Sequence, residues 1–207
     1  MRSRVDLPSS NYSYLALTIP LPFLSRCSYH HICGGRKNPL KRKLCNSFLS
    51  KLDDQIERAE HLISLVSADQ LDWTPPIPKG FSVSKLLGHL LDCLAGFCAA
   101  LYAANPEKLD HFLRLKELPL NEPSVARNAS LHLRTLRDHI HEGFACLKDS
   151  DLERRIPTVF VPDGEPLMSL LLINSEHLAS HKYQLFIYLR MLGIEVSSRD
   201  LYHFSGQ

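Results

Sequence analysis

Long hydrophobic runs are missing from this 207-residue chain, although 44% of its residues are hydrophobic. No uninterrupted apolar stretch reaches the roughly 18 residues that a membrane-spanning helix requires. We therefore expect a soluble protein without a membrane partner. Strand-like alternation is also scarce, and no internal repeat is visible. The apolar content that remains is enough to bury the core of one domain.

The cysteines lack the spacing of a disulfide framework. No CxxC pair occurs among the six, which are Cys27, Cys33, Cys45, Cys93, Cys98 and Cys146. Three of them fall within helical patterns, where a reduced thiol behaves as a small apolar side chain. This usage predicts a reducing compartment, the cytoplasm, and no disulfides, although an even number of cysteines also occurs in secreted proteins.

Acidic residues are nearly absent from the first 46 positions, which carry eight Lys or Arg against one acid, Asp6, for a net charge of +7. The rest of the chain carries sixteen basic and 21 acidic residues, for a net charge of −5. Four prolines and no hydrophobic period mark this first segment. We expect residues 1–46 to form a basic, poorly ordered extension and residues 47–207 to form the folded domain.

Other functions of the extension are less well supported by its sequence. A signal or transit peptide would also be basic, but neither a small-residue cleavage site nor an amphipathic helix is visible. The basic cluster at residues 36–43 resembles a nucleic-acid or membrane patch. It has no interleaved aromatic residues, so we do not expect a nucleic-acid partner.

Amphipathic helices dominate the sequence from Ser47 onward. Apolar residues recur at spacings of three and four from Phe48 to Val66, which predicts a first helix of about twenty residues. A loop with three prolines follows. Ser82 then fits the N-cap of a second helix that ends before Asn105.

Two further helices complete the expected fold. A third has its apolar positions between Ala129 and Leu147, and a fourth runs from about Leu167 to Leu192 and closes at Gly193. Between them, residues 158–161 form a short β-like run for which we expect an extended loop or a minimal hairpin. The fold class is therefore all-α, a four-helix bundle.

Two histidines of the fourth segment, His177 and His181, project from the same side of a helix because they are four residues apart. With eleven histidines in the chain, about half of one such pair is expected by chance. Both, however, fall in the apolar stripe that faces the core. An unsatisfied polar group there costs on the order of 1–3 kcal/mol, and a metal ion would satisfy both imidazoles.

The best third metal ligand is His89 of the second helix, which shares its face with mostly small residues. Asp92 lies one turn further on and could support His89 or act as a general base. The alternative for His89 is a histidine that is hydrogen-bonded to a backbone carbonyl. His132 and His139 share a face of the third helix and are further ligand candidates. The other histidines are less suited: His61 and His111 lie among charged residues, His141 falls on a polar face, and His30, His31 and His203 lie near the chain ends.

Three sequence segments resemble one known family. "FSVSKLLGHLLDCL" (residues 81–94) and "INSEHLASHKYQLFIYLRMLG" (residues 173–193) are similar to the second-helix and fourth-helix motifs of DinB-like (YfiT-type) metalloenzymes, and "LDWTPP" (residues 71–76) fits the loop before the second helix. The resemblance spans about residues 47–195. The extension lies outside it, and Cys93 and Cys98 replace expected aliphatic residues.

The resemblance implies a four-helix bundle, often a homodimer, with a divalent ion, zinc or nickel, on His89, His177 and His181. Some members of the family resemble thiol-S-transferases that use a low-molecular-weight thiol such as bacillithiol, and one branch consists of mycothiol-dependent isomerases. Cys93 could be a fourth ligand, but a thiolate would close the open position that a catalytic metal requires. We therefore expect a packed thiol.

These observations predict a metal-dependent enzyme that catalyses hydrolysis or low-molecular-weight-thiol transfer on a small-molecule substrate. Asp92 would be the catalytic proton acceptor, with Glu176 as a second candidate and Tyr183 and Gln184 as hydrogen-bonding neighbours. The alternative is a non-catalytic, dimeric helical bundle that binds a metal or a small ligand.

Overall fold

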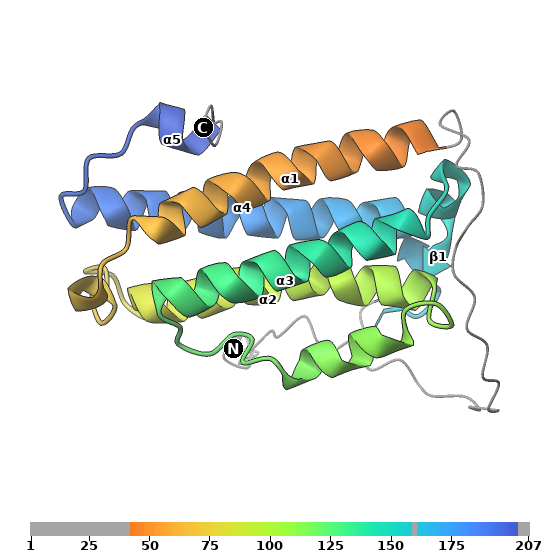
Figure 1. Ribbon diagram of the computed structural model, residues 1–207, viewed down its shortest axis with the longest axis horizontal. Helices are drawn as coiled ribbons and strands as arrows, with labels where there is room; N and C mark the ends of the chain where they lie inside the picture. The colour runs from red at the N-terminus through yellow and green to blue at the C-terminus, as the bar shows by residue number, and fades with distance from the viewer. Residues whose placement is uncertain (1–41, 159–160, 203–207) are drawn as a thin grey trace, which may run out of the picture.

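Four long helices form the fold in the computed structural model, which describes residues 42–158 and 161–202. Figure 1 shows them packed side by side with little strand structure, so the predicted all-α four-helix bundle is confirmed. The predicted basic extension lies almost wholly outside the described residues. The long helices are α1 (Lys43–Ser64), α2 (Val83–Ala104), α3 (Ala126–Ala145) and α4 (Leu167–Met191). The shorter elements are η2 (Ala68–Gln70), η3 (Asp110–Glu117), η4 (Asp149–Glu153), β1 (Arg155–Ile156), β2 (Glu165–Pro166) and α5 (Ser198–Tyr202).

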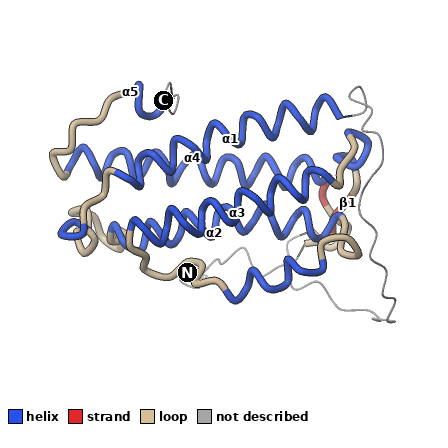
Figure 2. Tube along the Cα trace, in the orientation of Figure 1, coloured by secondary structure: helices blue, strands red, loops and turns tan. Residues whose placement is uncertain are grey.

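The helices run up, down, down and up. In Figures 1 and 2, α1 and α4 point in one direction, and α2 and α3 point in the other. The crossover between α2 and α3 contains the 3₁₀ helix η3 and returns the chain along the bundle. Because of this return, α2 packs in parallel against α3 and in antiparallel fashion against α4.

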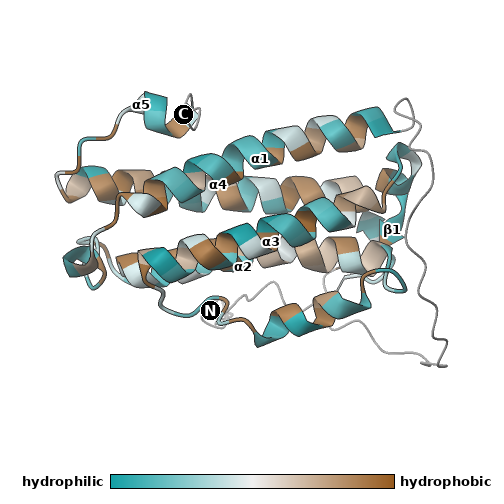
Figure 3. Ribbon diagram, viewed as in Figure 1, coloured by the Kyte–Doolittle hydropathy of each residue, from teal (hydrophilic) through white to brown (hydrophobic). Residues whose placement is uncertain are grey.

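Helix α2 is the central core helix, and apolar residues cover most of its circumference (Figure 3). It begins where predicted, because the Ser82 Oγ accepts a hydrogen bond from the Lys85 N–H at 3.2 Å. It also meets the length and composition criteria for a membrane span, contrary to our expectation that no segment would do so. This is weak support for a membrane location, because 78% of the apolar window is buried inside the bundle and a buried core helix passes the same test.

Helix α1 begins at Lys43, four residues before the predicted start. The reason is a tertiary contact, since the Asp149 carboxylate accepts hydrogen bonds from the Leu44 and Cys45 N–H groups, each at 3.0 Å. This carboxylate caps the first turn from another element, as an N-cap side chain would from within the helix. The side chain of Cys45 is fully buried, and burial raises the pKa of its thiol to about 12.

The predicted minimal hairpin is present, but its strands flank the β-like run. Strands β1 and β2 pair in antiparallel fashion through Ile156 and Glu165, and Arg155 lies opposite Pro166. Pro157 has no N–H group to extend the ladder. Thr158 and Val161 consequently belong to the loop between the strands, where the Thr158 N–H donates to the Val161 carbonyl at 3.1 Å.

Helix α4 ends at Met191 and is followed by Gly193 in the left-handed region (φ +80°), as predicted. A buried lysine that the sequence pattern did not reveal joins this helix to its neighbours. The Lys182 Nζ donates to the Gln55 Oε1 of α1 at 2.6 Å and to the Leu201 carbonyl of α5 at 3.3 Å. Burial, with a smaller contribution from the Arg58 charge, lowers the pKa of Lys182 to about 8.

Candidate metal centre

Three imidazoles from two helices converge between α2 and α4. The Nε2 atom of His89 lies 3.1 Å from the Nε2 of His181 and 3.2 Å from the Nε2 of His177. The antiparallel contact between the helices places the second turn of α2 opposite the His177–His181 turn of α4. The structure therefore brings together the three histidines that the sequence analysis selected.

Two amide side chains hold the outer nitrogens of two of these rings, those of His89 and His181. The Nδ1 of His89 lies 3.1 Å from the Asn121 Oδ1, and the Nδ1 of His181 lies 2.8 Å from the Gln184 Oε1. Because an amide oxygen only accepts hydrogen bonds, it fixes the proton of each ring on Nδ1. The lone pairs of both Nε2 atoms then face each other.

This arrangement fits a cation. Two lone pairs that meet at 3.1 Å repel each other, and a positive ion between them removes the repulsion. Two imidazole ligands at Zn–N distances of about 2.0–2.1 Å would lie about 2.9 Å apart at a right angle and about 3.3 Å apart at a tetrahedral angle. The observed Nε2 separations of 3.1 and 3.2 Å lie within that range.

Asn121 reaches His89 because the segment before α3 lies directly on the start of α2. Its N–H donates to the Gly88 carbonyl at 3.1 Å, and the Lys85 ammonium donates to the Asn121 carbonyl. A Cβ atom at Gly88 would collide with the Glu122 carbonyl oxygen, so glycine permits this close approach. The Asn121 backbone itself is left-handed, with φ +57°, a conformation that asparagine tolerates.

Gln184 is held by a second hydrogen bond. Its Nε2 donates to the Tyr188 hydroxyl at 2.8 Å, and the Tyr188 ring packs edge-on against Trp73, with 5.2 Å between the ring centroids. The single tryptophan of the chain thus contributes to the environment of His181. This series of contacts fixes the orientation of the His181 ring before any ligand binds.

Burial keeps the three imidazoles neutral. Phe81 covers the site, with its ring centroid 5.3 Å from that of His89 and 6.3 Å from that of His181. Desolvation is the main cause that lowers the pKa of His89 and His181, and together with the charges of the other two histidines it lowers the pKa of His177 to about 4. Neutral imidazole is the form that binds metals.

The predicted catalytic residue Asp92 lies beside His89 but on its outer side. Its Oδ2 is 4.0 Å from the His89 Nδ1, and its side chain is fully buried. The carboxylate therefore lies on the opposite side of the ring from the converging Nε2 atoms. This position favours a supporting role for Asp92 over a role as proton acceptor.

Cys93 is a packed thiol. It is fully buried, and burial followed by the charge of Asp92 raises its pKa above the ordinary range. A raised pKa disfavours the thiolate that a metal ligand requires. Among the described residues, Cys98 is buried in the same way, and Cys45 is also a buried free thiol.

Of the three other residues predicted near the site, one contacts a histidine of the site and two are exposed. Gln184 contacts His181, as expected. Tyr183 is half-exposed and stacks on Phe186 at a centroid distance of 6.0 Å, and Glu176 is exposed. Two residues of the site were not predicted. Phe81 is the first residue of the 81–94 motif, and Asn121 lies in a loop 32 residues after His89.

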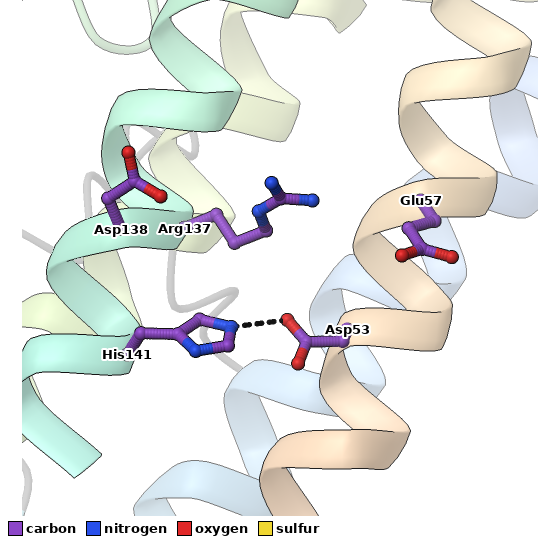
Figure 4. A pocket seen from close by; sticks show the side chains of 5 residues that line it. All are labelled: Asp53, Glu57, Arg137, Asp138 and His141. Carbon is purple, nitrogen blue, oxygen red and sulfur yellow. Dashed lines mark hydrogen bonds and ion pairs between the residues drawn. The ribbon is translucent and has the colours of Figure 1, made fainter. Parts of the chain in front are cut away.

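The remaining histidines mostly pair with carboxylates. His61 and His111, expected among charged residues, lie 2.9 Å from Asp200 and from Glu142 respectively, with side-chain exposures of 17% and 29%. His141 is on a polar face, as predicted. It lies 2.7 Å from Asp53 in a charged cavity of about 370 Å³ between α1 and α3 (Figure 4). Glu57, Arg137 and Asp138 complete the lining of that cavity.

The fold and the site define a class: a four-helix-bundle protein with three neutral, convergent histidines that could hold a metal ion. A sequence model described as the DinB superfamily matches residues 51–185, so the chain belongs to that superfamily. A crystal structure of a DinB-like protein, YjoA, from Bacillus subtilis has the same fold with a TM-score of 0.56 and 19% sequence identity, and the alignment covers 73% of this chain and 95% of that one. A search of curated proteins finds no match.

Proposed function

We propose that the protein is a metal-dependent enzyme in which His89, His177 and His181 hold one divalent ion, zinc or nickel. The observation that carries the proposal is the convergence of three Nε2 atoms, two of them 3.1 and 3.2 Å from the Nε2 of His89. When bound, such an ion supplies Lewis acidity to a water or thiol at the coordination positions that the protein leaves open. Hydrolysis or low-molecular-weight-thiol transfer on a small molecule is the chemistry that this centre suits.

The protein's own residues prepare the centre in three ways. Burial keeps the imidazoles unprotonated. Asn121 and Gln184 hold the ring protons on the outer nitrogens. Phe81 restricts water at the His89 and His181 rings, which strengthens electrostatic interactions inside the site. The buried Asp92 carboxyl group lies on the outer side of the His89 ring, with its Oδ2 4.0 Å from the Nδ1.

The test is metal content, measured by elemental analysis of tag-free protein. We expect His89→Ala and the double variant His177→Ala/His181→Ala each to lose one equivalent of metal relative to the wild type. His141→Ala is the matched control, because that ring pairs with a carboxylate on a polar face and its loss should leave metal content unchanged. Equal metal content in all four proteins would contradict the proposal.

A further inference from the structure

A second group of metal-binding side chains lies where the crossover meets α3. His111 belongs to η3, whereas His139 and Glu142 are one turn apart on α3. The Nε2 of His111 lies 2.9 Å from the Glu142 Oε2, and one ligand atom from each of the three residues lies within 4.8 Å of the other two. None of these residues belongs to the proposed catalytic centre.

The ring proton of His139 is also directed outward. The Nδ1 of His139 lies 2.8 Å from the Thr135 carbonyl oxygen, which can only accept, so the lone pair of His139 is on Nε2. The Nδ1 of His111 lies 3.8 Å from the exposed Asp110 carboxylate, beyond hydrogen-bond distance, and its Nε2 lies 2.9 Å from the Glu142 Oε2. Histidines that bind metals characteristically have their outer N–H oriented by a backbone carbonyl or a carboxylate in this way.

We propose that His111, His139 and Glu142 form a second divalent-metal site that ties the crossover to α3. Two imidazoles and one carboxylate are typical ligands of zinc and other first-row transition metals, whereas calcium and magnesium prefer oxygen ligands. The His111–Glu142 distance of 2.9 Å matches two ligands about 90° apart at bonds of about 2.0–2.1 Å.

The position of the site indicates a structural role. The side chains of His111 and Glu142 are 29% and 49% exposed, so an ion can enter from solvent without opening the core. Helix η3 is a 3₁₀ segment, in which hydrogen-bond geometry is poorer than in an α-helix. An ion shared between η3 and α3 orders this connection, which continues to Asn121 beside the first centre.

Zinc titration of the tag-free full chain tests the proposal in the His177→Ala/His181→Ala background, which removes the first centre. We expect one equivalent of zinc to bind there by calorimetry, and His139→Ala to reduce that affinity at least tenfold. His141→Ala is the matched control, since His141 also lies on α3 and pairs with a carboxylate at 2.7 Å. Glu142→Gln tests the carboxylate with little change of shape and should also weaken zinc binding.

Hydrogen exchange provides a second readout, which locates the effect of zinc along the chain. Zinc should slow amide exchange across residues 110–117 in the background protein and have no effect there after His139→Ala. The proposal is overturned if the background protein binds no zinc, or if His139→Ala and His141→Ala bind it equally. The proposed enzyme function would survive either result, because its own test concerns the metal lost with His89, His177 and His181.

Discussion

At the scale of single residues, the two nitrogens of each imidazole have different tasks. The Nε2 atoms of His89 and His181 converge, while their Nδ1 atoms contact Asn121 and Gln184. Without an outer partner a neutral imidazole can carry its proton on either nitrogen. The two amides therefore determine whether the site presents lone pairs or N–H groups to an ion.

Substitution of Asn121 tests this division of tasks. We expect Asn121→Gly to lower zinc affinity roughly 10–100-fold, the usual effect of losing a partner that orients a ligand histidine. Glycine tolerates the left-handed backbone at this position (φ +57°), so the loss would come from the missing amide. Asn121→Asp keeps an acceptor and should retain affinity. Calorimetric titration of both variants measures the difference, and equal affinities would exclude a positioning role for Asn121.

At the scale of elements, the loop before α3 has to lie close to α2, and Gly88 makes this possible. The Gly88 carbonyl accepts from the Asn121 N–H, and the Ser84 carbonyl accepts from the Ser124 N–H at 2.9 Å. A short extended segment thus lies along the first turns of the helix. The position of Asn121 relative to His89 depends on this contact.

Gly88→Ala should displace the segment. In an open helix the change would stabilise the protein by about 1 kcal/mol, but here the new methyl group meets the Glu122 backbone, and overpacking of this kind costs about 1–3 kcal/mol. We expect a lower midpoint of urea unfolding together with weaker zinc binding. Gly143→Ala is the control, because its Cβ would meet the Leu101 side chain at 2.8 Å. It should affect stability only, and weakened zinc binding in both variants would contradict the argument.

The sequence predicted the elements that depend on local patterns. Hydrophobic periodicity revealed the four helices, and Ser82 and Gly193 revealed two of their ends. The sequence did not reveal features that depend on contacts between residues far apart in the chain. The earlier start of α1 depends on Asp149, more than 100 residues away, and the burial of Lys182 depends on α1 and α5.

The candidate site likewise contains residues that local spacing predicts and residues that only the folded structure brings together. His177 and His181 share a helix face, so their spacing places them together, and His89 followed from its small-residue surroundings. Asn121 lies 32 residues from the histidine that it contacts, in a loop without periodicity. The group formed by His111, His139 and Glu142 was not predicted, because His111 has charged neighbours in the sequence. In the structure its ring lies beside α3, 2.9 Å from Glu142.

At the scale of the whole molecule, the buried histidines link stability to pH. Unfolded histidine titrates near pH 6.5, whereas burial lowers the pKa of His177 to about 4 and also lowers the pKa of His89 and His181. Below pH 6.5 the unfolded chain therefore binds protons that the metal-free folded protein does not. The free energy of unfolding should fall as the pH drops from about 6.5 to about 4, and these three groups should contribute no slope above that window.

Urea unfolding of the metal-free protein between about pH 7.5 and about pH 4.5 measures this slope. His177→Ala/His181→Ala should show a shallower decline, because two of the three groups are removed. Asp200 contributes its slope mainly below the measured range, between its unfolded pKa of about 3.9 and its folded pKa, which hydrogen bonds from Ser197 and His61 lower to about 2. Bound zinc competes with protons for the same nitrogens of the folded protein, so zinc should raise the free energy of unfolding and extend the decline to lower pH, while the onset stays near the unfolded pKa of about 6.5. Identical slopes in the wild type and the double variant would show that the buried histidines do not govern the acid sensitivity of the bundle.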